Sequence, residues 1–277
     1  MILYMLPINK IYIDSRHRTQ SSESDTDFEI QFKQTLNLPE NCTCVVSDVI
    51  LKNTITTIER FNENVYVRAN NVDKIVKLDS RMYNIRDFGD HLTYRMNLAF
   101  MPAPGAFAPF LFQFIEDVFN SVILIVPTAT NTLRIFTDEE LKLDSIKWTG
   151  EWFDKSNPRS ANSVLNNYGT SKTYTNRVPY KSNPISLQPL DYVLLNAYGL
   201  GNTSYGSREG ERHIIKKIPL SPYGETTVMS YFDVSDYTPA NKISLSRLKF
   251  TLTDPFSNIV DLHGSNVSFS LLFISND

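Results

Sequence analysis

The feature that most constrains the fold is the alternation of apolar and polar residues from Lys242 to Ile274. The apolar side chains stand at Ile243, Leu245, Leu248, Phe250 and Leu252, and then at Val267, Phe269, Leu271 and Phe273. A repeat of two predicts β-strands with one buried face, joined by turn residues that begin at Asp254. The alternation changes phase near Ser246 and Arg247, which predicts a β-bulge there.

The last of these strands is so apolar that it has to lie inside a sheet, between strands from earlier in the sequence. Residues 42–55 are apolar on both faces and are therefore expected to form a central strand. Closure between such distant segments is typical of Greek-key sandwiches. We predict a mainly β fold: a single jelly-roll β-sandwich with one or two helices and an inserted loop-rich subdomain.

One helix is expected after a hairpin that turns at Asn70 and Asn71. Asn84 is a suitable N-cap, and Asp87 suits the first helical turn. An apolar stripe at helical spacing follows, formed by Ile85, Phe88, Leu92, Met96 and Ala99. Three prolines within residues 101–109 end this helix.

The rest of the chain is expected to divide into parts of different character. Residues 110–119 are predicted to form a second short helix, and residues 122–126 and 133–136 a hairpin. Residues 146–184 are polar and unperiodic with scattered aromatic residues, so they form either a contact surface or a loop packed on its own domain. The expected parts are residues 1–26 as an N-terminal strand and polar arm, 27–100 with 185–277 as the jelly-roll sandwich, and 101–184 as an insertion or additional subdomain.

Composition excludes several classes of function. The net charge of −3 argues against direct, sequence-independent binding of nucleic acid, which needs a dense basic face. No apolar run is long enough for a membrane span, and the first ten residues resemble a strand more than a signal peptide. Cys42 and Cys44, the only cysteines, are expected to be buried free thiols.

Residues with the spacing of a catalytic or metal site are missing from the sequence. The four histidines stand in four different segments, and no zinc, phosphate-loop or nucleophile-elbow motif is present. Acidic clusters such as residues 138–140 are expected to be solvated surface charge rather than a glycosidase pair. We therefore expect no enzyme activity, no cofactor and no metal, and a function that depends on shape and association.

Four segments carry a family resemblance. IYIDSRHRT followed by DFEIQF, residues 83–100, RHIIKKIPLSPYGE and residues 245–273 resemble vertical jelly-roll capsid proteins of eukaryotic double-stranded DNA viruses. They are most similar to the penton, or minor capsid, proteins of virophages and Polinton-type elements. The segments appear in the expected order over most of the chain, and residues 101–184 resemble nothing in this family.

The resemblance implies a structural capsid protein of the virion. It implies a homopentamer at the five-fold vertices of an icosahedral capsid, beside a double jelly-roll major capsid protein. Flexible arms would then order against neighbouring subunits. The candidate contact residues are Arg16, His17 and Arg18 in the polar arm, and Tyr205 and Arg208 in the glycine-rich loop.

Two alternatives remain open from the sequence. The first is another minor, cement or major-type capsid protein, which copy number in particles would distinguish. The second is a carbohydrate-binding β-sandwich protein that uses its aromatic loops, because fold alone does not settle function.

Overall fold

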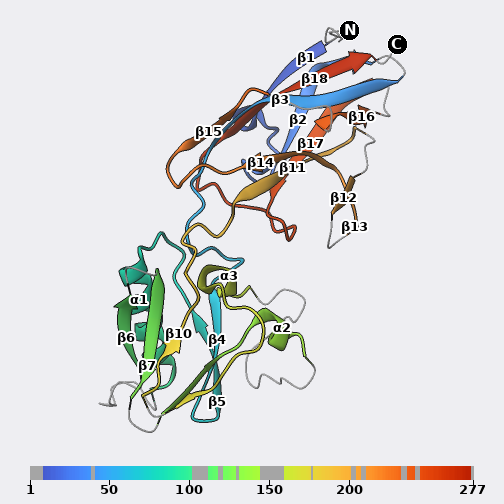
Figure 1. Cartoon of the computed structure of the whole chain (residues 1–277). Helices are drawn as coiled ribbons and strands as arrows, with labels where there is room; N and C mark the ends of the chain where they lie inside the picture. Colours follow the sequence, from blue (N-terminus) through green and yellow to red (C-terminus); the bar gives the residue numbers. More distant parts are fainter. Residues whose placement is uncertain are drawn as a thin grey trace, which may run out of the picture. The chain divides into compact units, whose positions relative to one another are not determined.

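The computed structural model describes residues 9–38, 41–101, 112–117, 121–128, 131–143, 159–175, 177–200, 204–206, 210–231, 236–240 and 244–275. Contacts divide the chain into two compact units, each of which is described by itself (Figure 1). Unit 1 contains Met1–Ile55 and Leu190–Asp277, and unit 2 contains Thr56–Pro189.

Unit 1 is a jelly roll of two antiparallel sheets. Its strands are β1 (Asn9–Asp14), β2 (Asp27–Asn37), β3 (Cys42–Lys52), β11 (Tyr192–Tyr198), β14 (Ile214–Pro219), β15 (Thr226–Met229), β17 (Ser244–Thr253) and β18 (Val267–Ser275). Sheet I has the order β1-β18-β3-β15, and the short β16 (Thr238–Ala240) also pairs with β3; sheet II has the order β14-β11-β17-β2. Sheet I thus takes the first, eighth, third and sixth of the eight strands, and sheet II takes the others, which is the jelly-roll order.

The position of β18 confirms the prediction made from its apolar sequence. It pairs with β1 on one side and with β3 on the other, so that Phe269 lies between Ile13 and Val49. The predicted bulge is also present, because the pairing of β17 with β2 shifts between Leu245 and Arg247. Two free, buried thiols, Cys42 and Cys44, lie on the central strand β3, as predicted.

Aromatic rings join the two sheets in the core of unit 1. The ring centroids of Phe28 and Phe250, on neighbouring strands of sheet II, are 5.5 Å apart. Phe250 also meets Phe269 of sheet I edge to face, with centroids 5.1 Å apart. Such contacts add to the burial of apolar area that holds the sandwich together.

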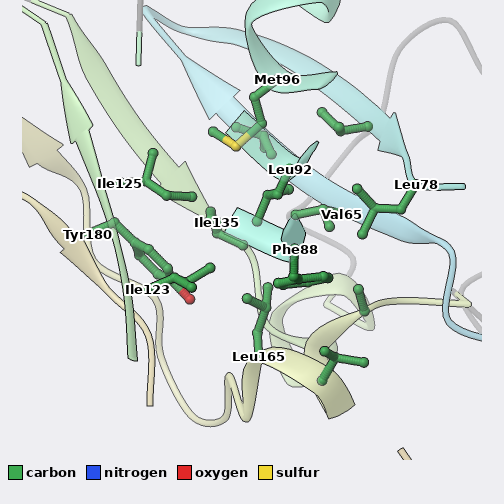
Figure 2. Packing of buried hydrophobic residues seen from close by; sticks show 14 of the residues in the cluster. Val65, Leu78, Phe88, Leu92, Met96, Ile123, Ile125, Ile135, Leu165 and Tyr180 are labelled. Carbon is green, nitrogen blue, oxygen red and sulfur yellow. The ribbon is translucent and has the colours of Figure 1, made fainter. Parts of the chain in front are cut away.

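Unit 2 has its own two sheets and a long helix. Its elements are β4 (Asn64–Ala69), β5 (Val72–Lys77), α1 (Ile85–Ala99), β6 (Phe112–Asp117), β7 (Val122–Pro127), β8 (Thr132–Ile135), α2 (Asp138–Leu141), α3 (Asn162–Leu165), β9 (Tyr174–Thr175) and β10 (Tyr180–Lys181). One sheet has the order β10-β7-β6 and the other β5-β4-β8-β9. Figure 2 shows the buried residues that both sheets and α1 direct into one core, among them Val65, Phe88 and Ile125.

The helix and the first hairpin of unit 2 form as predicted. The side chain of Asn84 accepts a hydrogen bond from the backbone N–H of Asp87 at 2.8 Å and caps α1. Asn70 and Asn71 both have positive φ, which suits the two-residue turn between β4 and β5.

Two other predictions for unit 2 are wrong. Residues 112–117 form the strand β6 rather than a helix, because Phe112 and Phe114 face the core in alternation with exposed Gln113. Strands β7 and β8 are not a hairpin, since β7 pairs with β6 and β10 while β8 pairs with β4 and β9. Their buried side chains enter the same core from different sheets.

The division into units differs from the boundary that was expected at residue 101. Residues 56–100 pack in unit 2, because β4 pairs with β5 and β8 and α1 packs on β6. Unit 2 is therefore inserted between the third and fourth strands of the jelly roll. Trp148, Trp152 and the rest of 144–158 lie outside the described residues.

Candidate subunit-contact surfaces

The three predicted contact residues of the polar arm follow β1 directly. Arg16 and His17 belong to a short 3-10 helix, Ser15–His17, and both are exposed. The guanidinium of Arg16 donates to the Asp14 carboxylate from Nε at 2.9 Å and from Nη2 at 2.5 Å. This contact lowers the pKa of the Asp14 carboxyl below its ordinary value. Arg18 forms an ion pair with Asp25.

The polar arm is folded onto its own unit. The backbone N–H of Thr19 donates to the carbonyl of Glu29 at 2.8 Å, and that of Glu29 donates to the hydroxyl of Ser22 at 2.9 Å. The hydroxyl of Thr26 donates to the carbonyl of Val260 at 2.7 Å. Serine and threonine side chains thus order residues 14–27, a segment that has no apolar residues. Contact of Arg16, His17 and Arg18 with another subunit stays a prediction.

The other predicted residues lie on a separate hairpin. Tyr205 belongs to β12 (Ser204–Gly206), which pairs with β13 (Gly210–Arg212) and places Tyr205 opposite Glu211. Its side chain and the whole of Arg208 lie outside the described part of the chain. The hairpin connects β11 to β14 of sheet II, whereas the polar arm leaves sheet I. The two predicted groups therefore start from different sheets.

The outward face of sheet I carries exposed apolar residues, which we call the outer patch: Tyr12, Ile50 and Val228. Their exposed fractions are 75%, 50% and 69%. Ile50 lies opposite Val228 of β15 on one side and Ser268 of β18 on the other, and Tyr12 lies opposite Ser270. The residues on either side of Ile50 in β3 are fully buried, so Ile50 points away from the core.

The outward face of sheet I is covered at the end farther from Ile50 and Val228. Val45, Leu272 and Ile274 form a small apolar cluster separate from the main core, and Tyr237 packs against it. Val45 and Leu272 are partners across β3 and β18. Tyr237 precedes β16, and the pairing of β16 with β3 at Cys42–Cys44 keeps Tyr237 packed against the cluster.

A charged pair lies beside the outer patch. Lys10 Nζ is 2.8 Å from Asp48 Oδ2, and the Ser47 hydroxyl donates to the same oxygen at 3.1 Å. The hydrogen bond from Lys10 lowers the pKa of the Asp48 carboxyl. Lys10 Nζ also lies 5.0 Å from the centroid of the Tyr12 ring, so this cation contacts both the carboxylate and the patch.

Unit 2 has a shallow depression on the outer side of α1. Its volume is about 390 Å³, and its lining is Arg81, Asp87, Asp90, His91 and Tyr94. His91 Nε2 is 3.4 Å from the backbone N of Asp79, from which it accepts a hydrogen bond. Burial lowers the pKa of His91, so its imidazole is neutral at pH 7. The lining therefore places cationic Arg81 and anionic Asp87 and Asp90 around the imidazole of His91.

The described ranges contain neither a metal-binding cluster nor a membrane-spanning helix. No three His, Cys, Asp or Glu side chains there are grouped so as to hold a metal ion. No helix in this part of the chain has the length and apolar character needed to cross a membrane.

Comparisons with known proteins identify the fold. No protein-family model matches the sequence, and no curated protein matches it. The crystal structure of the selenomethionine-labelled mavirus penton protein matches with a TM-score of 0.50 and 12% identity, over 96% of this chain and 99% of that chain. The chain has the fold of the mavirus penton protein. The resemblance to penton proteins in the sequence is thus confirmed for the fold.

A second solved structure also matches over nearly the whole chain. It is the 3.5 Å cryo-EM structure of the Sputnik virophage, with a TM-score of 0.42 and 13% identity, over 96% of this chain and 98% of that chain.

The penton fold of this chain presents surface residues that the sequence did not single out. Tyr12 and Val228 were not recognised as surface residues, because each alternates with buried neighbours as any strand residue does. One signal was available for Ile50, since residues 42–55 are apolar on both faces. The structure covers the outward side of β3 at Val45, whereas Ile50 is half exposed and stands between Asp48 and Lys52 on that side.

Proposed function

We propose that this chain is the penton protein of a virus capsid, which forms homopentamers at the five-fold vertices of an icosahedral shell. The observation that carries the proposal is the fold likeness to the mavirus penton protein, which spans nearly the whole of both chains. Both the jelly roll and the inserted unit 2 fall within that span.

The architecture of unit 1 supports this role. It is a complete single jelly roll, with eight strands in two sheets, whereas the major capsid protein expected beside it has two jelly rolls. A ring of five subunits needs two different patches on each subunit, and a closed rotation makes the assembly finite. We propose that the double jelly-roll major capsid protein surrounds this ring in the virion. The role is structural and not catalytic.

Native mass spectrometry and cryo-electron microscopy of the purified chain test the proposal. We expect a pentamer in solution or within particles, and a five-fold symmetric ring in images. Quantitative mass spectrometry of intact particles should find about sixty copies of this chain. A cement protein or a major capsid protein would be present in many more copies.

Two results would count against a penton role. One is a chain that stays monomeric even inside particles. The other is saturable binding of a glycan by a chain that never enters particles, which would favour a carbohydrate-binding sandwich.

A further inference from the structure

We propose that an ion pair between Lys216 and Asp236 is a latch that keeps residues 236–240, which we call the strap, closed on the edge of sheet I. The jelly roll of unit 1 then has a second form, in which the strap alone has left β3. The strap consists of Asp236, Tyr237 and the three residues of β16. The inference concerns a conformational device within one chain and does not depend on the proposed penton function.

Lys216 carries its charge into the interior of unit 1. It lies on β14, the edge strand of sheet II, where it is opposite Leu195 of β11. Leu195 is fully buried and is also opposite Leu252, two positions along β17 from the core residue Phe250. Directly opposite residues share one face of a sheet. The side chain of Lys216, which is 3% exposed, is therefore directed between the two sheets.

Asp236 supplies the carboxylate that neutralises this buried ammonium group. Lys216 Nζ donates to Asp236 Oδ2 at 2.6 Å, and the Asp236 side chain is 26% exposed. The pair thus ties the strap, on the edge of sheet I, to the opposite sheet. Loss of one partner from a buried ion pair leaves an unpaired charge, which is strongly unfavourable. The closed strap therefore needs this carboxylate as long as residue 216 carries a charge.

The strap is a short element that can separate from the rest of the jelly roll. Its strand β16 pairs with only three residues of β3, Cys42–Cys44, and Pro239 at its centre has no N–H to donate. Tyr237 packs on the small apolar cluster around Val45, which is separate from the main core. Along the same residues β3 keeps its pairing with β18, so sheet I stays intact without the strap. Short elements of this kind open at a lower free energy than the whole domain.

Opening of the strap changes what sheet I presents to solvent. It uncovers the backbone edge of β3 at Cys42–Cys44 and the outward side of the cluster around Val45. It also gives the ammonium group of Lys216 a path to water. The thiol of Cys44 faces the interior, on the other side of β3 from Val45, and stays there in both forms. The balance between the two forms then depends on one buried ion pair.

The test removes the carboxylate first and then the ammonium group as well. In Asp236→Asn, the closed strap would enclose an unpaired charge, so the strap should open. In Lys216→Met, the strap encloses an apolar side chain while the partly exposed Asp236 carboxylate reaches water, so the strap should stay closed. The double variant with both substitutions should also stay closed. A role of Asp236 that is independent of Lys216 would not produce this rescue.

Hydrogen exchange of the full chain measures strap opening directly. The amides of Thr238 and Ala240, and those of Cys42 and Cys44 opposite them, should exchange ~100-fold faster in Asp236→Asn than in the wild type. In Lys216→Met and in the double variant these amides should exchange within ~10-fold of the wild-type rate. The amides of residues 248–252 on β17 should keep their wild-type rates in all variants.

Asp48→Asn is the matched control for removal of a carboxylate from an ion pair. Asp48 pairs with Lys10 at 2.8 Å, but the side chains of Lys10 and Asp48 are 36% and 42% exposed. An exposed ion pair contributes little to stability, so this variant should leave strap exchange unchanged. Strap exchange as fast as in Asp236→Asn would overturn the assignment of the latch to the buried pair.

A second measurement covers the case in which Asp236→Asn does not fold, as judged by circular dichroism. Hydrogen exchange of the wild type is then followed in increasing urea, below the unfolding transition. The strap amides should exchange through an opening that depends little on urea, because it exposes little surface. The amides of residues 248–252 should show the steeper dependence of global unfolding. An equal urea dependence for both sets would overturn the inference.

Two results with folded variants would also overturn it. Exchange at the wild-type rate in Asp236→Asn would show that the strap stays closed without the ion pair. Equally fast strap exchange in Asp236→Asn and in the double variant would show that the charge of Lys216 does not drive the opening.

Discussion

Replacing Gly89 with alanine should destabilise unit 2, although alanine is the better helix former. Gly89 lies buried within α1. An added Cβ would overlap the ring of Phe114, whose Cδ2 atom lies only 2.6 Å from the Cβ position. The glycine is therefore explained by the close approach of β6 to the helix.

The magnitude follows from two opposing effects. Alanine in place of glycine within a helix gains about 1 kcal/mol. Overpacking against a ring that must be displaced costs about 1–3 kcal/mol. We expect a net loss of about 1 kcal/mol for Gly89→Ala in the wild type. In a Phe114→Ala background the overlap disappears, and the same change should instead stabilise the protein by about 1 kcal/mol.

Urea unfolding of the four proteins in this double-mutant cycle measures the effect, with near-ultraviolet circular dichroism to follow the aromatic core. The coupling between the two sites should be about 2 kcal/mol, well above the value for independent positions. If Gly89→Ala stabilised the wild type as much as the Phe114→Ala variant, the ring would not lie against the helix and the reasoning would be refuted.

Three further predictions concern buried polar groups. Asn97→Leu should lower the free energy of unfolding, measured in urea, by about 2–4 kcal/mol. The reason is that the Asn97 side chain forms hydrogen bonds of 3.0 Å with both the N–H and the carbonyl of Phe112. A loss below about 1 kcal/mol would contradict this pairing. Burial by itself would raise the pKa of Glu140, but hydrogen bonds from Ser171, Thr137 and Arg134 lower the net value below 4.5. Its stabilising contribution is therefore complete above pH 4.5 and is lost as the pH falls through the lowered pKa. Glu140→Gln should therefore reduce the fall in melting temperature as the pH drops below 4.5. A variant whose melting temperature falls with pH as steeply as that of the wild type would contradict this role of Glu140. Burial also raises the pKa of the Cys44 thiol. A thiol reagent at pH 8 should therefore modify Cys44 only as fast as the protein unfolds. Faster labelling of the native protein would show that the thiol is accessible.

Local signals in the sequence were enough to predict much of unit 1. Alternation identified β17 and β18, and the change of phase located the bulge that the structure has between Leu245 and Arg247. The apolar residues on both faces of β3 predicted its central position. The cap at Asn84 and the apolar stripe of α1 were equally direct, because both depend on residues within a few positions of each other.

Features that depend on distant partners were not predictable in the same way. Nothing local distinguishes β4, which belongs to unit 2, from a strand of the sandwich, because its partner β8 lies more than sixty positions later. The strand β6 was mistaken for a helix because Phe112 and Phe114 lie in a short apolar run, which is ambiguous between the two structures. The exposure of Val228 likewise depends on what covers sheet I in three dimensions.

The pairing of β18 has a consequence for synthesis of the protein. Thr43 on β3 donates a hydrogen bond to the carbonyl of Ile274, 231 positions later. Unit 2 is encoded without interruption, so translation delivers all of it well before β18 leaves the ribosome. Until then, β1 and β3 lack the strand that joins them in sheet I. A chain released before β18 is made would therefore leave β1 without its partner in sheet I, so the sandwich of unit 1 can close only when synthesis is nearly complete.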